Sequence, residues 1–133
     1  MDTISDMLTR IRNATLAGHP ETAVPFSKLK KKIAEVMKRK GFVEDVFEEG
    51  DEKKKNLKIR LRYSRDEKGR ENPYIQGLRR VSRQGQRIYV GKSGIPIVKN
   101  GCGFAVISTS RGLMTDEEAR RAGLGGELIC EIW

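Results

Sequence analysis

Cysteine and histidine are scarce in this chain, which has two cysteines and one histidine among 133 residues. Cys102 and Cys130 lie far apart and form no CxxC pair, so neither a disulfide framework nor a zinc site is indicated. We expect both to act as small buried apolar residues. His19 stands in a Gly-His-Pro turn without a second imidazole or a cysteine nearby, which argues against a metal ligand or a general base.

Long apolar runs are also missing. No uninterrupted apolar stretch approaches the ~18 residues of a membrane helix, and the opening residues 1–6 lack the basic and then apolar layout of a signal peptide. We therefore expect no membrane partner and a cytoplasmic or organellar location. A chain of 133 residues with 37% hydrophobic content fits one compact domain or two very small ones. A large multidomain enzyme is excluded.

Acidic residues are absent from the whole stretch between Asn72 and Thr115. The full chain has 27 Lys and Arg against 18 Asp and Glu, a formal charge of +9, which favours a polyanionic partner. The alternative is that this charge only keeps the protein in solution. Acids gather instead between Glu44 and Glu52, so we expect a polyanion to avoid that segment. The acid-free stretch carries its own set of cations: Arg79, Arg80, Arg83, Arg87, Lys92, Lys99 and Arg111.

Patterns in the first half alternate between helical and extended. Apolar residues at helical spacing predict a helix over about 4–17 that ends near Gly18. Residues 24–26 are short and extended, and Ser27 is a good N-cap for a second helix that ends at Gly41. Strands are predicted over 42–47 and 57–63, with a polar turn between them. The order is therefore helix, strand, helix, strand, strand.

The second helix is amphipathic and basic. Its apolar stripe comprises Leu29, Ile33, Val36 and Met37. Its other face presents basic side chains that are expected to be solvated and to contact a polyanion: Lys28, Lys30, Lys31, Lys32, Lys38, Arg39 and Lys40.

A charged, turn-forming segment at 64–73 is either the tip of a hairpin or a linker between subdomains. We place the boundary near residue 72, which divides the chain into an N-terminal α/β subdomain, 1–72, and a C-terminal mainly β subdomain, 73–133. Strands are predicted in the second part over 75–81, 87–90, 101–109 and 127–133. Thr115 and Glu118 form a capping box for one short helix that ends at Gly123. The fold class is α+β.

Each candidate catalytic or nucleotide-binding motif in the sequence lacks a feature that its chemistry requires. Gly85 and Gly91-Lys92-Ser93 resemble a phosphate-binding loop, but five residues separate the glycines where the motif needs four, and a helix does not follow. The glycines at 123–126 precede a strand and do not open a helix, so they are not a dinucleotide fingerprint. Ser108 and Ser110 have no evident histidine base. The sequence therefore predicts no enzyme, no catalytic or metal-binding residue and no cofactor.

The segment 108–115 concentrates hydroxyl groups and one guanidinium between a buried strand and a helix N-terminus. Such hydroxyls either bond the local backbone or reach the 2′-hydroxyls, phosphates and base edges of RNA. The helix N-terminus would add a favourable dipole for anions. Tyr89, which follows Arg87, could stack on an unpaired base, and this favours RNA.

At these residues the sequence resembles the bacterial form of the eighth protein family of the small ribosomal subunit. The resemblance spans the chain, from the segment 5–14 through 79–82 and 87–89, and is most specific at 108–116, 119–120 and 123–130. It implies a primary rRNA-binding structural protein that grips a helix of the central domain of 16S-type rRNA and helps assemble the subunit platform. Neighbouring ribosomal proteins would be its other partners, and outside the ribosome it would be a monomer. Some members of the family repress their own operon by binding its mRNA.

The resemblance also implies RNA-binding residues. These are Ser108, Thr109, Ser110 and Gly112 on the loop, with Tyr89 and Glu127 on neighbouring strands. To them the charge pattern adds Arg87, Arg111, Lys30, Lys31 and Lys32.

Two other functions remain open from the residues alone. A small DNA-binding protein would carry similar charge, although no helix-turn-helix pattern appears and the basic helix lacks Asn or Gln for base reading. A nucleotide-binding enzyme would have to rely on Gly91-Lys92-Ser93, and the absence of thermal protection by nucleotide would remove that alternative.

Overall fold

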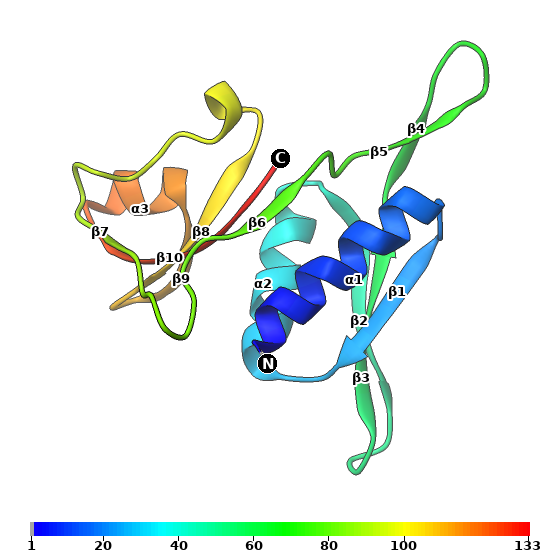
Figure 1. The fold of residues 1–133 in the computed structure, drawn as a ribbon, viewed down its shortest axis with the longest axis horizontal. Coiled ribbons are helices and arrows are strands. Elements are labelled where there is room, and N and C mark those ends of the chain that lie inside the picture. The colour runs from blue at the N-terminus through cyan, green and yellow to red at the C-terminus, as the bar shows by residue number, and fades with distance from the viewer. Residues whose placement is uncertain (1) are drawn as a thin grey trace. The chain divides into compact units, whose positions relative to one another are not determined.

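The computed structural model describes residues 2–133, which form two compact units (Figure 1). One unit is Thr3–Gln76, and the other is Gly77–Trp133 together with Asp2. Helices and antiparallel strands mix in the first unit, whereas strands dominate the second, so the expected α+β class is confirmed. The chain passes from one unit to the other after Gln76, a little beyond the boundary that composition suggested.

The first unit has two helices on a three-stranded sheet. Its elements are α1 (Thr3–Ala17), β1 (Glu21–Pro25), α2 (Lys28–Arg39), β2 (Val43–Gly50) and β3 (Lys55–Leu61). The sheet is antiparallel in the order β1-β3-β2, and α1 packs against β1 while α2 packs against β2 (Figure 1). Strict alternation along β3 buries Leu57, Ile59 and Leu61, as the sequence pattern predicts.

The charged segment at 64–73 is a hairpin, which resolves the alternative left open above. Strands β4 (Tyr63–Arg65) and β5 (Glu71–Pro73) pair antiparallel. At the tip, the Asp66 carboxylate accepts hydrogen bonds from the backbone N–H groups of Lys68 and Arg70, each at 2.9 Å. These bonds, with the Arg70 backbone first, lower the pKa of Asp66.

On α2, the first turn differs from the prediction. Leu29 is 42% exposed, whereas Lys30 is only 3% exposed. The buried residues are Lys30, Ile33, Ala34, Val36 and Met37, so position 30 belongs to the i, i+3, i+4 stripe and position 29 lies beside it. The stem of Lys30 is apolar and can lie in this stripe. Burial lowers the pKa of Lys30, Asp6 partly opposes this effect, and Arg10 adds to it.

The second unit is a sheet covered on one face by a short helix. Its elements are β6 (Leu78–Arg80), β7 (Tyr89–Val90), the 3₁₀ turn η1 (Lys99–Gly101), β8 (Phe104–Thr109), β9 (Gly112–Thr115), α3 (Asp116–Ala122) and β10 (Gly126–Ile132). Strands follow the order β6-β10-β8-β9, and β7 also pairs with β10. Helix α3 packs on β8 and β9. One core cluster is formed by Ile95, Val98, Ala105, Ile107, Ala119 and Leu128.

Two expectations for this unit were wrong. The strand predicted over 101–109 begins only at Phe104, because Lys99, Asn100 and Gly101 take positive φ angles and form the 3₁₀ turn. Cys102, directly after that turn, is exposed, while Cys130 on β10 is buried as expected. Burial raises the pKa of the Cys130 thiol to about 12, so this thiol stays protonated at neutral pH.

Candidate nucleic-acid interface

Four strands of the second unit bring one residue each into a single row. Glu127 on β10 pairs with Tyr89 on β7 and with Ser108 on β8, and Ser108 pairs with Leu113 on β9. The next row contains Leu128, Ile107 and Met114, whose side chains belong to the core beneath α3. Because side chains alternate between the two faces of a strand, the row of Tyr89, Glu127, Ser108 and Leu113 lies on the opposite face. We call it the interface row.

Glycines allow the strands of the interface row to approach closely. A Cβ at Gly126 would collide with the Ser108 carbonyl oxygen, and one at Gly125 would collide with that of Val90. The start of β10 therefore fits between β7 and β8 only because these two positions carry no side chain.

The segment from Ser108 is a β-hairpin and not the loop that we expected. Strands β8 and β9 pair up to Thr109 and Gly112, which leaves Ser110 and Arg111 as a two-residue turn. Gly112 has φ 100°, a conformation that favours glycine. The Thr109 hydroxyl donates to the Gly112 carbonyl at 2.8 Å and accepts from the Arg111 N–H at 3.1 Å. Thr109 and Gly112 thus shape the turn, which is the local role that hydroxyls at turns often have.

Ser108 and Ser110 differ from Thr109 in this respect. Within residues 2–133 neither serine hydroxyl has a hydrogen-bond partner, and Ser110 is exposed while Ser108 is half-buried. Ser108 points to the face opposite Thr109 because the two are neighbours on a strand. Tyr89 is 71% exposed, so its ring is open to solvent. The structure therefore brings together a free aromatic ring and two free hydroxyls from separate parts of the sequence.

Glu127 is held from one side. Its Oε2 accepts from the Ser82 hydroxyl at 2.5 Å and from the Arg87 guanidinium at 3.1 Å. The other carboxylate oxygen, Oε1, has no partner in the described part of the chain. Sequence reasoning missed Ser82, which is fully buried, since its partner lies 45 residues away and no local pattern connects them. Arg87, predicted as a cation for RNA, is partly neutralised by this pairing.

The three lysines predicted to contact RNA on α2 belong to the other unit and differ from one another. Lys30 is buried, so it is not part of a solvated face. Lys31 pairs with Glu48 on β2 at 2.6 Å, which raises the Lys31 pKa and lowers that of Glu48. Lys32 is exposed and forms no ion pair within residues 2–133.

The acidic segment 44–52, which we expect a polyanion to avoid, lies next to the basic helix α2. Strand β2 packs beside α2, where Asp45 pairs with Lys38 at 2.9 Å in addition to the Lys31–Glu48 pair. The hydrogen bond from Lys38 lowers the pKa of Asp45. Part of the helix charge, that of Lys31 and Lys38, is therefore compensated within the unit.

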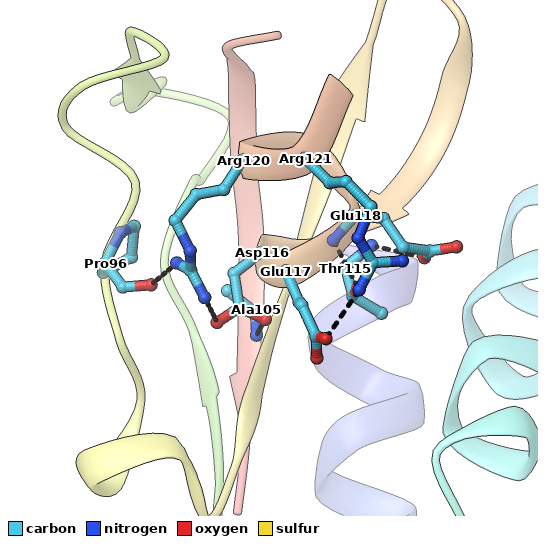
Figure 2. A network of polar contacts seen from close by, with 8 residues as sticks. All are labelled: Pro96, Ala105, Thr115, Asp116, Glu117, Glu118, Arg120 and Arg121. Atoms are coloured by element: carbon cyan, nitrogen blue, oxygen red, sulfur yellow. Dashed lines mark hydrogen bonds and ion pairs between the residues drawn. The ribbon is translucent and has the colours of Figure 1, made fainter. Parts of the chain in front are cut away.

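The N-terminus of α3 offers no anion site, contrary to the expectation from its dipole. Thr115 and Glu118 form the predicted capping box, and the first turn carries the carboxylates of Asp116, Glu117 and Glu118. Asp116 is buried and accepts from the Ala105 N–H at 3.2 Å and from Arg120 at 3.2 Å. Figure 2 shows this network, in which Arg120 also reaches the Pro96 carbonyl. The dipole is thus satisfied by the protein's own acids, and the network ties α3 to β8 and to the loop at Pro96.

Within residues 2–133, no group of three or more His, Cys, Asp or Glu side chains is arranged to hold a metal ion. None of the helices in the same range has the length and hydrophobicity needed to cross a bilayer.

The sequence profile described as "Ribosomal protein S8" matches residues 2–133. The chain belongs to this family. It is 53% identical over 132 residues to small ribosomal subunit protein uS8 of Sorangium cellulosum, covering 99% of this chain and 98% of that protein. The uS8 proteins of Trichormus variabilis and Thermosipho africanus are 51% and 49% identical over 99% of this chain, which covers 97% and 98% of those proteins.

Membership confirms the resemblance seen in the motifs. The protein is a structural, non-enzymatic ribosomal protein of the small subunit, and rRNA binding is the general role of its family.

Proposed function

We propose that this protein is a primary binder of a helix in the central domain of 16S-type rRNA and helps assemble the platform of the small subunit. The observation that carries the proposal is the interface row, in which the exposed Tyr89 ring, the Glu127 carboxylate and the free Ser108 hydroxyl are register neighbours on adjacent strands.

Each group in this surface suits one feature of folded RNA. The Tyr89 ring can stack on an unpaired base. Ser108 and Ser110 can bond 2′-hydroxyls, base edges or phosphate oxygens, because their hydroxyls are not used within the described residues. A carboxylate repels phosphate but accepts hydrogen bonds from base amino groups and 2′-hydroxyls, and Glu127 has Oε1 available for this. Arg111, exposed at the hairpin turn and without an ion pair in residues 2–133, can contact phosphate.

The proposal extends to partners and location. The protein works on cytoplasmic ribosomes beside neighbouring small-subunit proteins, and it is monomeric before it binds. An mRNA that presents the same arrangement of unpaired bases and backbone would bind the same surface, which would allow the protein to repress its own operon.

The test compares two transcripts of the small-subunit rRNA, one of the central domain and one of the 5′ domain, at a fixed physiological salt concentration. We expect a preference for the central domain on the order of a thousandfold. A DNA version of the bound stem serves as the control for 2′-hydroxyl recognition, and it should bind weakly. Equal affinity for both transcripts would contradict the proposal, and equal affinity for the DNA stem would favour the DNA-binding alternative.

A further inference from the structure

Strands β6 and β7 lie along the same edge of β10, one after the other. The line of backbone bonds runs from the Val81 N–H, which donates to Ile129, to the Ser82 N–H, which donates to Leu128 at 3.1 Å. It resumes at Ile88, whose carbonyl accepts from the Leu128 N–H at 2.9 Å. Between Ser82 and Ile88 the chain moves away from β10 and turns back, and backbone hydrogen bonds between Arg83 and Gln86 close the turn at 83–86. The segments before and after residues 83–87 thus pair with the same edge of β10 as one interrupted strand. Residues 83–87 form an excursion that leaves this edge and returns to it.

The Ser82 side chain closes the gap at the base of this excursion. Its hydroxyl oxygen accepts a hydrogen bond from the Ile88 N–H at 3.0 Å, and the same hydroxyl donates a hydrogen bond to Glu127 Oε2 at 2.5 Å. The residue is 0% exposed, so water does not replace either bond. One hydroxyl thereby joins the two ends of the excursion to the first residues of β10.

We propose that Ser82 is a positioning residue for RNA recognition, which holds Tyr89 and the Glu127 carboxylate in their bound-state geometry before RNA arrives. This inference rests on the proposed function, because it gives Tyr89 and Glu127 their task. Ser82 itself does not contact RNA, since it is buried.

The backbone on either side of Tyr89 is held by pairing with β10 and by Ile88 and Val90, which pack against the core cluster, whereas the Tyr89 side chain is exposed. Strand β7 is only two residues long, Tyr89–Val90, and the Tyr89 side chain is exposed, so core packing does not fix it. The orientation of the ring follows the backbone at Ile88 and Tyr89, and the Ser82 hydroxyl adds an anchor at the Ile88 N–H to the backbone bond from Leu128. Both Ser82 and Arg87 donate to the same oxygen of Glu127, and this leaves Oε1 for the RNA. Orienting these groups in advance reduces the ordering cost of binding.

The experiment is a double-mutant cycle of Ser82→Ala and Tyr89→Ala, with binding to the central-domain transcript as the readout. Ser82→Ala should weaken specific binding about tenfold, the size expected when a buried hydrogen-bonding group loses its partner, and leave binding to a random RNA duplex unchanged. In the Tyr89→Ala background the same change should have a clearly smaller effect, because only its action through Glu127 remains and coupled residues are not additive. Ser93→Ala, an exposed serine of the same unit, is the matched control and should bind as wild type.

A purely structural role for Ser82 predicts a different result: the loss would be the same in both backgrounds and would extend to the random duplex. That outcome overturns the inference while the proposed function stands. If Tyr89→Ala alone leaves specific binding unchanged, both the inference and the assigned role of Tyr89 fail. Should Ser82→Ala not fold, Ser82→Cys, which keeps a weak donor and acceptor in a similar volume, takes its place in the cycle with the same criteria.

Discussion

The two units carry basic side chains in different electrostatic settings. In Thr3–Gln76, two lysines of α2, Lys31 and Lys38, form ion pairs with Glu48 and Asp45 on the acidic strand β2. In Gly77–Trp133, acids occur only near the C-terminal end of the sequence, and Arg83, Lys92 and Arg111 remain exposed without an ion pair among residues 2–133.

This difference teaches that the density of positive charge in a sequence is not the charge available to a ligand. The most basic segment of the chain is α2, yet part of its charge is already compensated and one of its lysines is buried. The second unit has fewer cations in any short window, but it combines them with free hydroxyls and an open aromatic ring. Affinity for RNA of any sequence depends on available cations, and specificity depends on the neutral groups.

The largest expected effect comes from removing the neutral groups of the second unit together. A Tyr89→Ala, Ser108→Ala, Ser110→Ala variant should lose about 3 kcal/mol or more of specific binding, since stacking alone contributes roughly 1–3 kcal/mol per base. Binding to random duplex RNA should hardly change. Titrations of both RNAs, with thermal unfolding of the free variant, measure this. A lower melting temperature with an intact preference would mean that these side chains only support the fold.

A smaller effect is expected from closing the space at the start of β10. Gly126→Ala places a methyl group against the Ser108 carbonyl oxygen and should lower the free energy of unfolding by about 1–3 kcal/mol. Gly85→Ala is the matched control, because a Cβ there meets nothing within 4 Å. Amide exchange should become faster in Gly77–Trp133 and stay the same in Thr3–Gln76. Equal acceleration in both units would show that they unfold together.

The difference in available positive charge between the units should shrink when the carboxylates that pair with the lysines of α2 are removed. An Asp45→Asn, Glu48→Gln variant removes the carboxylates that pair with Lys38 and Lys31. Random-RNA affinity should rise, and each freed cation that reaches a phosphate should steepen the log–log salt slope by ~0.7 to 0.9.

Glu52→Gln, Glu67→Gln is the control for that variant, because it changes the net charge equally without breaking an ion pair. It should leave the salt slope unchanged. The same increase in slope for both variants would attribute the effect to net charge and not to the pairing.

The smallest effect concerns Lys30. Lys30→Met should be neutral or stabilising by up to about 1 kcal/mol, because an apolar side chain of similar length replaces a buried amine without an ion pair in the described residues. Since the folded-state pKa of Lys30 lies below its ordinary value of 10.5, the unfolded chain binds more protons just below that pH. The stability of the wild type should therefore rise with pH in this window relative to Lys30→Met. Chemical denaturation of both proteins at pH 8 and 10 measures the difference, and a constant difference would contradict the burial of the amine.

Sequence patterns that span about one helical turn were sufficient to predict several local features of the fold. The N-cap at Ser27, the capping box of Thr115 and Glu118, and the alternation along β3 all appear as predicted. Each depends on residues a few positions apart, so their physical chemistry is complete in the local sequence. The long motif from 108 to 130 also indicated the family, and through it the set of candidate RNA-binding residues.

Tertiary structure alone decided which of those residues are available. Thr109 and Ser108 are neighbours with similar side chains. Strand pairing places the Thr109 hydroxyl where it bonds the hairpin turn, and it leaves the Ser108 hydroxyl without a partner in the described residues. Ser82 and Glu127 are 45 positions apart and meet only because β6 and β7 share one edge of β10. Likewise, Lys31 is compensated because β2 packs beside α2. Partners of this kind are set by strand register and helix packing, and a residue's type and its immediate neighbours do not encode them.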